Sequence, residues 1–483
     1  MSSLKKNLAY NVAYQILVII LPLITAPYVS RVLGADGLGT YSYIFSIVTY
    51  FGLFGMLGIA NHGNRSVALV RDNRQKVSEA FSNTYIIQLC TTVIALLLYF
   101  LFIYCWFSGD KTITYIESII VLSYVLDITW FFFGLEQFAV TVTRNAIIKI
   151  ATVVAIFIFV RSREDLWIYA LIMSCGMLFS QIYLWLRIRK YADFCKPSWS
   201  QVKSNIKPVL MLFIPAIAYS IYKLLDKVML GAMSSMSQVG LFDNAEKIIN
   251  IPSSLITAFG TVMMPRITVL LGTGDEHRIS YLNKISVRYF TLLVVGAAFG
   301  LAGICNVLAP VYFGSEFVGS APIIAGLGFS LIFVTWANVI RTQYLIPNKL
   351  DKPYVISSVI GALANLAVNI ILIPKFAGIG AMIGTIIAEF TVFFVQLILV
   401  RRSFPMSQYL QPVLFLFPIG MIMFAVVYWI GAYMGNTIIT LIIQILVGGF
   451  LYLSGSMVYL KVIHDEFFEK LTSRIFHHGR HNA

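Results

Sequence analysis

The chain has 483 residues, of which 59% are hydrophobic and 12% are charged, and its net charge is +14. A soluble globular protein has about 25% charged residues, so this composition excludes an ordinary soluble fold. The apolar stretches are continuous rather than alternating, which predicts membrane helices and not a membrane barrel. The expected fold class is therefore an all-α integral membrane protein.

Apolar stretches of roughly 20 residues, the length that crosses the hydrocarbon core of a bilayer, recur along the whole chain. The first follows Lys5 and Lys6 and is too long for the core of a signal peptide, so we expect it to be retained. About fourteen transmembrane helices are predicted, over residues 8–30, 39–60, 81–107, 113–135, 143–160, 166–187, 208–230, 240–263, 285–309, 322–347, 355–374, 378–400, 409–430 and 437–460.

The positive charge has a topological explanation. Lys and Arg gather in alternate connections, with dense clusters over 65–76 and 187–207. The positive-inside rule then places both termini of this multi-pass membrane protein in the cytoplasm. Membrane lipids are expected partners of the 187–207 segment, and nucleic acid is not an expected partner.

The two halves of the chain resemble each other weakly. Residues 39–65 align without gaps to residues 240–266, which pairs Gly39 with Gly240. The stretch "TWFFFGLEQF" (129–138) likewise matches "TWANVIRTQY" (335–344). Six predicted helices separate the copies, so both copies have the same orientation in the membrane.

This repeat predicts two parallel six-helix lobes followed by two additional helices. The expected division is an N-lobe at 1–187, a basic cytoplasmic linker at 188–207, a C-lobe at 208–400, the last two helices at 401–460 and a cytoplasmic tail at 461–483. The sequence shows no phosphate-binding loop and no hydrolase or metalloprotease motif. We therefore expect a transporter without cofactor or metal, and not an enzyme.

Charged residues inside the predicted helices are the main candidates for a site. Two neighbouring helices carry charges at positions i, i+3 and i+4, near their extracytoplasmic ends, which places each set on one helix face. These six residues are Lys223, Asp226, Lys227, Asp243, Glu246 and Lys247. They could neutralise one another across the hairpin, or line a cavity that binds an anionic headgroup.

Four other residues complete the candidate list. Asp127 and Glu389 lie near the middle of their helices with no basic residue close in sequence, which makes them candidates for coupling to H⁺ or Na⁺. Lys149 and Arg31 are additional candidates for binding substrate, although Lys149 is close enough to a helix end to extend its amine to the interface.

The opening "NLAYNVAYQILVIILPLITAPYVSRVLGADGLGTYSYIFSIVTYFGLFGMLGIANHGNR" resembles the first two helices of bacterial polysaccharide transporters. The stretch "VMLGAMSSMSQVGLFDNAEKIINIP" is similar to the start of the second lobe in that family. The family contains the O-antigen and capsule repeat-unit flippases, within the multidrug/oligosaccharidyl-lipid/polysaccharide exporter superfamily.

The resemblance implies a flippase that moves undecaprenyl-diphosphate-linked oligosaccharide to the outer leaflet of the bacterial inner membrane by alternating access. It also implies the polysaccharide polymerase and chain-length machinery as partners. Two other functions stay open. A multidrug antiporter of the same superfamily would favour an acidic cavity, and a repeat-unit polymerase would carry a large extracytoplasmic loop, which the spacing of the apolar stretches does not leave room for.

Overall fold

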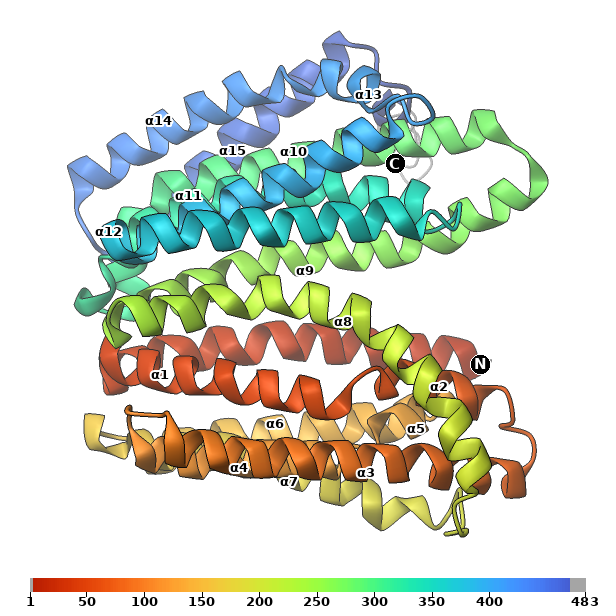
Figure 1. The fold of residues 1–483 in the computed structure, drawn as a ribbon. Helices are drawn as coiled ribbons and strands as arrows, with labels where there is room; N and C mark the ends of the chain where they lie inside the picture. The colour runs from red at the N-terminus through yellow and green to blue at the C-terminus, as the bar shows by residue number, and fades with distance from the viewer. Residues whose placement is uncertain (1–2, 470–483) are drawn as a thin grey trace, which may run out of the picture. The chain divides into compact units, whose positions relative to one another are not determined.

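The computed structural model describes the backbone of residues 3–469 and the side chains of residues 20–213 and 224–469. Every regular element over residues 3–469 is helical, which confirms the predicted all-α class (Figure 1). In this part of the chain ten helices are long and apolar enough to cross a membrane, or eleven if a bent pair is counted as one crossing. The number fourteen and the cytoplasmic position of both termini remain predictions.

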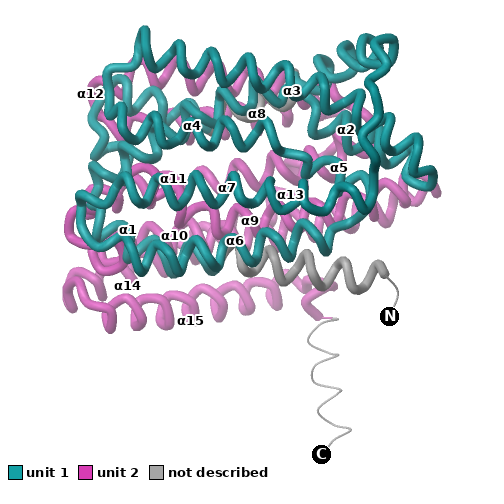
Figure 2. Tube along the Cα trace, turned by 90° about the horizontal axis from the view of Figure 1, so that it is seen from below, with its two compact units in different colours: residues 1–240 teal, residues 241–483 magenta. Residues whose placement is uncertain are grey.

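The chain divides into two compact units, Met1–Gly240 and Leu241–Ala483 (Figure 2). The lobe and linker boundaries inferred from the repeat also remain predictions. The helices that begin in the first unit are α1 (Ser3–Met56), α2 (Ile59–Ala68), α3 (Arg74–Cys105), α4 (Lys111–Val125), α5 (Thr129–Gly134), α6 (Phe138–Phe159), α7 (Leu166–Ile188), α8 (Trp199–Met233) and α9 (Met236–Thr273).

The second unit contains most of α9 and the helices that follow it. These are α10 (Glu276–Leu308), α11 (Ser320–Ile340), α12 (Asp351–Val400), α13 (Met406–Val413), α14 (Leu416–Met434) and α15 (Ile438–Val462). A π-helical turn, Arg341–Leu345, follows α11.

Two of these helices are each interrupted by one residue with positive φ. Gly34 in α1 has a φ of 70°, a conformation that suits glycine, and Ala377 in α12 has a φ of 47°. The ribbons of α1 and α12 each turn back on themselves (Figure 1). Each interruption lies between two stretches that the sequence predicts as separate membrane helices.

Close packing joins the two halves of α12. A side chain at Gly384 would collide with Asn369, and one at Gly361 would collide with Val392. The amide of Asn369 also donates to Oδ1 of Asn365 at 3.1 Å. Small residues on one half therefore let the backbone of the other approach, as is common between membrane helices.

The two tryptophans that the repeat matches make equivalent hydrogen bonds in the two units. In the first unit, Nε1 of Trp130 donates to Oε1 of Gln88 on α3 at 2.8 Å. In the second, Nε1 of Trp336 donates to Oγ1 of Thr291 on α10 at 2.9 Å. Both indole groups are buried, and a buried indole N–H requires such an acceptor.

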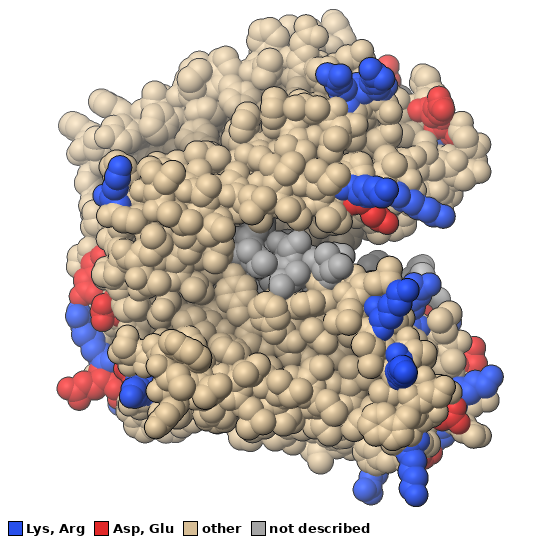
Figure 3. All heavy atoms as spheres, in the orientation of Figure 1, with Lys and Arg blue, Asp and Glu red and all other residues tan. Residues whose placement is uncertain are grey.

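On one face of the molecule, the Lys, Arg, Asp and Glu side chains gather toward the ends of the helices (Figure 3). On the face drawn in Figure 3, a broad stretch between these ends carries no Lys, Arg, Asp or Glu. This pattern is what the hydrocarbon of a bilayer requires, because a charge exposed to it is costly. The protein is thus a multi-pass membrane protein.

Candidate functional site

The charged positions of α8 lie in the first unit. Asp226 is buried and lies close enough to Tyr50 of α1 to act electrostatically on its hydroxyl, and Lys227 is half-buried. The side chain of Lys223 lies outside the described residues. The depth of this cluster in the membrane and its role in binding substrate remain predictions.

The charged positions of α9 lie in the second unit. Nζ of Lys247 lies 2.8 Å from Oδ2 of Asp243 and donates to Oδ1 of Asn244 at 3.0 Å. Asp243 is buried, and Glu246 is half-buried. Lys247 is thus partly neutralised within its own helix, and pairing between the α8 and α9 charges remains a prediction.

Asp127 has a structural partner that the sequence did not indicate. Its Oδ1 accepts a hydrogen bond from the backbone N–H of Thr129 at 2.9 Å, at the start of α5. Gln88 donates to the backbone carbonyl of Asp127 at 2.8 Å. A backbone carbonyl and a backbone N–H at the break between α4 and α5 therefore both have hydrogen-bond partners. Asp127 therefore holds a broken helix together, and its role in coupling remains a prediction.

Glu389 lies in the second half of α12 and is buried. The neighbouring Phe390 and Phe393 pack against Phe333 of α11, with ring centroids 5.3 and 6.4 Å apart. Glu389 thus lies beside an aromatic contact between α11 and α12, and its role in coupling remains a prediction. Lys149 of α6 is half-buried, and Arg31 is exposed three residues before the Gly34 reversal.

A buried arginine, Arg144 of α6, was missed by the sequence analysis. Its side chain is 4% exposed and binds three neutral acceptors. Nη2 donates to Oδ1 of Asn145 at 2.8 Å, and Nη1 donates to Oγ1 of Thr129 at 3.3 Å and to Oε1 of Gln181 at 3.4 Å. Amide and hydroxyl oxygens from α5, α6 and α7 therefore accept hydrogen bonds from this buried guanidinium.

These four residues, Arg144, Asn145, Thr129 and Gln181, form what we call the Arg144 cluster. It lies beside Asp127, because Thr129 contacts both Arg144 and Asp127. A guanidinium can donate to several oxygens in one plane, and the amide and hydroxyl oxygens that accept from Arg144 carry no formal charge. The cluster can thus exchange some of its neutral acceptors for an anion.

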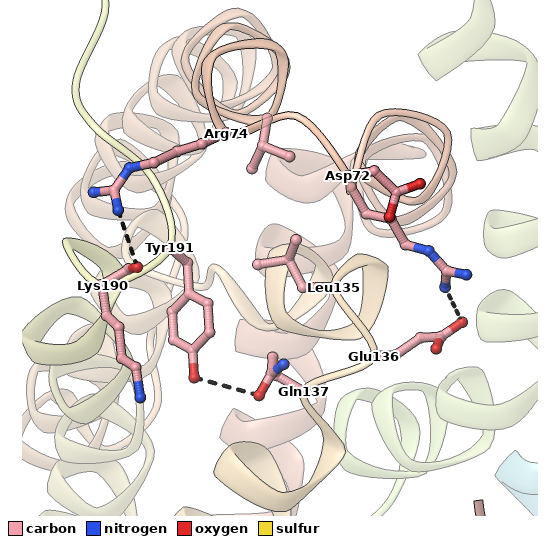
Figure 4. Close-up of a pocket in the computed structure, with 9 residues that line it drawn as sticks. Asp72, Arg74, Leu135, Glu136, Gln137, Lys190 and Tyr191 are labelled. Carbon is pink, nitrogen blue, oxygen red and sulfur yellow. Dashed lines mark hydrogen bonds and ion pairs between the residues drawn. The ribbon is translucent and has the colours of Figure 1, made fainter. Parts of the chain in front are cut away.

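A surface hollow of about 590 Å³ lies at the predicted cytoplasmic end of the first unit (Figure 4). It is lined by Arg71, Asp72, Arg74, Val77, Leu135, Glu136, Gln137, Lys190 and Tyr191. Arg71 pairs with Glu136, and the hydroxyl of Tyr191 lies 3.3 Å from Oε1 of Gln137. These contacts join the connection before α3, the connection before α6 and the segment after α7.

A second ion pair fixes the segment after α7. Nε and Nη2 of Arg74 donate to the two carboxylate oxygens of Asp193 at 2.9 and 3.0 Å. The hydrogen bonds from Arg74 hold the pKa of Asp193 below its ordinary value. Because this pKa is lowered in the folded protein, the pair stabilises the fold at pH values above the unfolded pKa of about 3.9, and the effect disappears as the pH falls through the folded pKa.

We expect Asp193→Asn to speed amide hydrogen exchange over residues 189–196 at pH 7. The wild type should approach the same exchange as the pH falls below about 4, once differences in intrinsic exchange are removed. Asp72→Asn, an exposed acid in the same hollow, is the matched control and should leave the segment unchanged. Equal protection of Asp193→Asn and wild type at pH 7 would refute this role for the pair.

No group of three or more His, Cys, Asp or Glu side chains in the described part of the chain is arranged to hold a metal ion. The polar groups that the described residues offer to a ligand are buried cations, amides and single carboxyl groups.

Comparisons with known proteins agree with this architecture. A family model described as "Polysaccharide biosynthesis protein" matches residues 4–271, more than half of the chain. The chain belongs to this polysaccharide biosynthesis protein family. The resemblance found in its opening helices is thereby confirmed.

This family member is similar to two curated proteins named "Putative O-antigen transporter". The protein from Shigella dysenteriae is 24% identical over 374 residues, which are 76% of this chain and 92% of that protein. The protein from Escherichia coli K12 is 23% identical over 416 residues, which are 83% of this chain and 97% of that protein. Both names describe a transporter and not an enzyme.

Among solved structures, the lipid II flippase MurJ in an inward closed conformation has the same fold. The TM-score is 0.74 at 16% identity, over 94% of this chain and 99% of that chain. This likeness concerns the fold alone.

Proposed function

We propose that this protein is a flippase that moves undecaprenyl-diphosphate-linked oligosaccharide from the inner to the outer leaflet of the bacterial cytoplasmic membrane. Membership of the polysaccharide biosynthesis protein family and relatives named as O-antigen transporters support this class of substrate. The polymerase and the chain-length machinery would then act on the product at the outer leaflet.

The observation that carries the proposal is the buried guanidinium of Arg144. A polyprenyl tail can stay in lipid throughout the transfer, whereas a diphosphate cannot enter hydrocarbon without compensating cations and donors. Arg144 is a buried cation that donates to Asn145, Thr129 and Gln181, and a guanidinium binds phosphate oxygens in a bidentate manner. Arg144 is 4% exposed here, so substrate must bind in a conformation that opens the cluster.

The polar residues expected from the sequence have complementary roles in this proposal. The diphosphate would bind near the outer end of the path to three lysines, Lys223, Lys227 and Lys247. The acids Asp226, Asp243 and Glu246 would give up their contacts with these lysines as the diphosphate binds. Arg31 and Lys149 would extend this set of cations. Asp127 and Glu389 would couple the transfer to a gradient of H⁺ or Na⁺.

We expect Arg144→Gln to reduce the rate of transfer of lipid-linked oligosaccharide by about 10- to 100-fold, because a hydrogen bond to a charged group contributes about 1.5–3 kcal/mol. Arg144→Lys should retain part of the rate, since the charge remains and the bidentate geometry is lost. Arg401→Gln, at an exposed arginine that follows α12, is the matched control. Equal rates for Arg144→Gln and Arg401→Gln at equal membrane abundance would remove Arg144 from the substrate path.

The proposed function is tested in cells that lack the protein, by measuring the amount, identity and sidedness of lipid-linked oligosaccharide. Accumulation on the cytoplasmic leaflet is expected, and the accumulated lipid identifies the sugar. Normal levels would favour a multidrug antiporter, and accumulation on the outer leaflet would favour a polymerase.

A further inference from the structure

Glu117 of α4 is a buried acid that neither the site nor the proposed function uses. Its side chain has no exposed surface, and neither carboxylate oxygen has a hydrogen-bond partner in the described part of the chain. An ionised carboxylate without donors is strongly disfavoured in such surroundings, whereas a neutral carboxylic acid is tolerated. The neutral, protonated form of Glu117 therefore fits these surroundings better than the carboxylate does.

Among the described residues, no group forms a hydrogen bond or an ion pair with Glu117. Helix α4 packs against α1, α3 and α7. From α3, Tyr99 lies beside Glu117, and its hydroxyl donates to the carbonyl of Thr114 at 2.8 Å. The hydroxyl of Tyr99 thus bonds to the backbone of α4 one turn before Glu117, and it does not hydrogen-bond to the acid.

Other titratable groups on the packed helices do not hydrogen-bond to Glu117 either. The described ones are Arg31, Asp36, Tyr28, Tyr41, Tyr43 and Tyr50 on α1, Arg74, Lys76, Glu79, Tyr85, Cys90, Tyr104 and Cys105 on α3, and Tyr169, Cys175, Tyr183 and Arg187 on α7. The basic residues of α3 and α7 lie at the ends of those helices that are remote from Glu117. Arg74, for example, is 25 residues away in sequence from Tyr99, the residue of α3 that lies beside Glu117.

The position of Glu117 along α4 places it near one side of the membrane. The helix begins at Lys111, where Asp110 accepts a hydrogen bond from the N–H of Ile113 at 3.1 Å. Six residues at about 1.5 Å each put Glu117 roughly 9 Å from that end. This is the predicted extracytoplasmic end, so a small movement of α4 against its neighbours would open Glu117 to the outside.

We propose that Glu117 is a proton-binding site of the first unit, which is loaded here and exchanges its proton with the extracytoplasmic side. Binding converts the carboxylate and one proton into the neutral acid, and it needs no other reactant. A proton at Glu117 favours the closed packing of α4, and its release favours a conformation in which water reaches the carboxylate. The link from this proton to transport rests on the proposed function, and the protonation itself does not.

The first test is infrared spectroscopy of the purified full-length protein at pH 7, comparing wild type with Glu117→Gln. Glutamine keeps the size and neutrality of the protonated acid, so the variant should fold. We expect the difference spectrum to show the loss of one neutral carboxylic-acid C=O band. Glu164→Gln, at an exposed acid, is the control and should lose none. An unchanged acid band in Glu117→Gln would overturn the proposal.

The second test is the pH dependence of transfer of lipid-linked oligosaccharide into vesicles containing each variant. We expect Glu117→Gln to lose the pH dependence that wild type shows, while Glu164→Gln keeps it. If the acid band is lost but the pH dependence is unchanged, the proton is permanent and the exchange is refuted. If wild type transfers no oligosaccharide, the proposed function fails, and the infrared result still decides the protonation of Glu117.

Discussion

Asp465→Ala is expected to lower the free energy of unfolding of the second unit by about 3–5 kcal/mol, because it leaves a buried cation without its partner. Asp465 follows α15, and its carboxylate pairs with Arg288 of α10, where both residues are under 10% exposed. The same carboxylate accepts from the hydroxyl of Tyr289 at 2.9 Å and from the N–H of Phe468 at 2.8 Å. Thermal unfolding in detergent measures the loss.

Two variants separate the ion pair from a general effect of mutation. Glu469→Gln changes an acid that pairs with the highly exposed His464, and it should leave stability nearly unchanged. The double variant Arg288→Met with Asp465→Leu removes both charges and should recover most of the loss. Asp465→Ala with wild-type stability would show that the pair does not hold the end of α15 to α10.

Gly39→Ala is the second substitution with a large expected effect. A Cβ at Gly39 would collide with the carbonyl of Met236, and a Cβ at Gly240 would collide with the carbonyl of Ala35. Both obstacles are backbone atoms, so the helices themselves would have to separate. We expect a loss of about 3 kcal/mol or more, at the upper end of overpacking effects, with little folded protein in the membrane.

The same helix supplies the control. Gly37 is two residues away, and a Cβ there would meet Cβ of Leu33 at 3.5 Å, an ordinary contact distance. Gly37→Ala should therefore be tolerated and could be slightly stabilising in a helix. Membrane abundance and melting temperature of the two variants, measured side by side, decide the matter. Similar behaviour of both would mean that the crossing at Gly39 adapts.

The apolar stretches predicted the helices well, because each must satisfy its own backbone in lipid. The repeat aligns Gly39 with Gly240, and a close helix contact explains why both positions are glycine. Each of the two glycines lies against the backbone of the helix that carries the other. Helix breaks were less visible. The interruption between α4 and α5 depends on Gln88, which reaches the carbonyls of Tyr124 and Asp127 from a different helix.

The candidate site was only partly predictable, for the same reason. Arg144 donates hydrogen bonds to Thr129 and Gln181, which are 15 and 37 residues away in sequence, so the sequence does not show that these residues meet. Arg288 and Asp465 are 177 residues apart. Glu117 stood in the sequence as an acid two turns inside an apolar helix, but its complete burial depends on the packing of α1, α3 and α7.

Transfer of substrate by the purified protein in lipid vesicles tests the proposed flippase activity without other cell components. A polyprenyl-diphosphate-linked oligosaccharide would be placed in one leaflet, and its exposure to a membrane-impermeant sugar-modifying enzyme would be followed in time. We expect transfer between leaflets to require the protein and to fall by about 10-fold or more in Arg144→Gln. Transfer no faster than in protein-free vesicles would contradict the proposed activity.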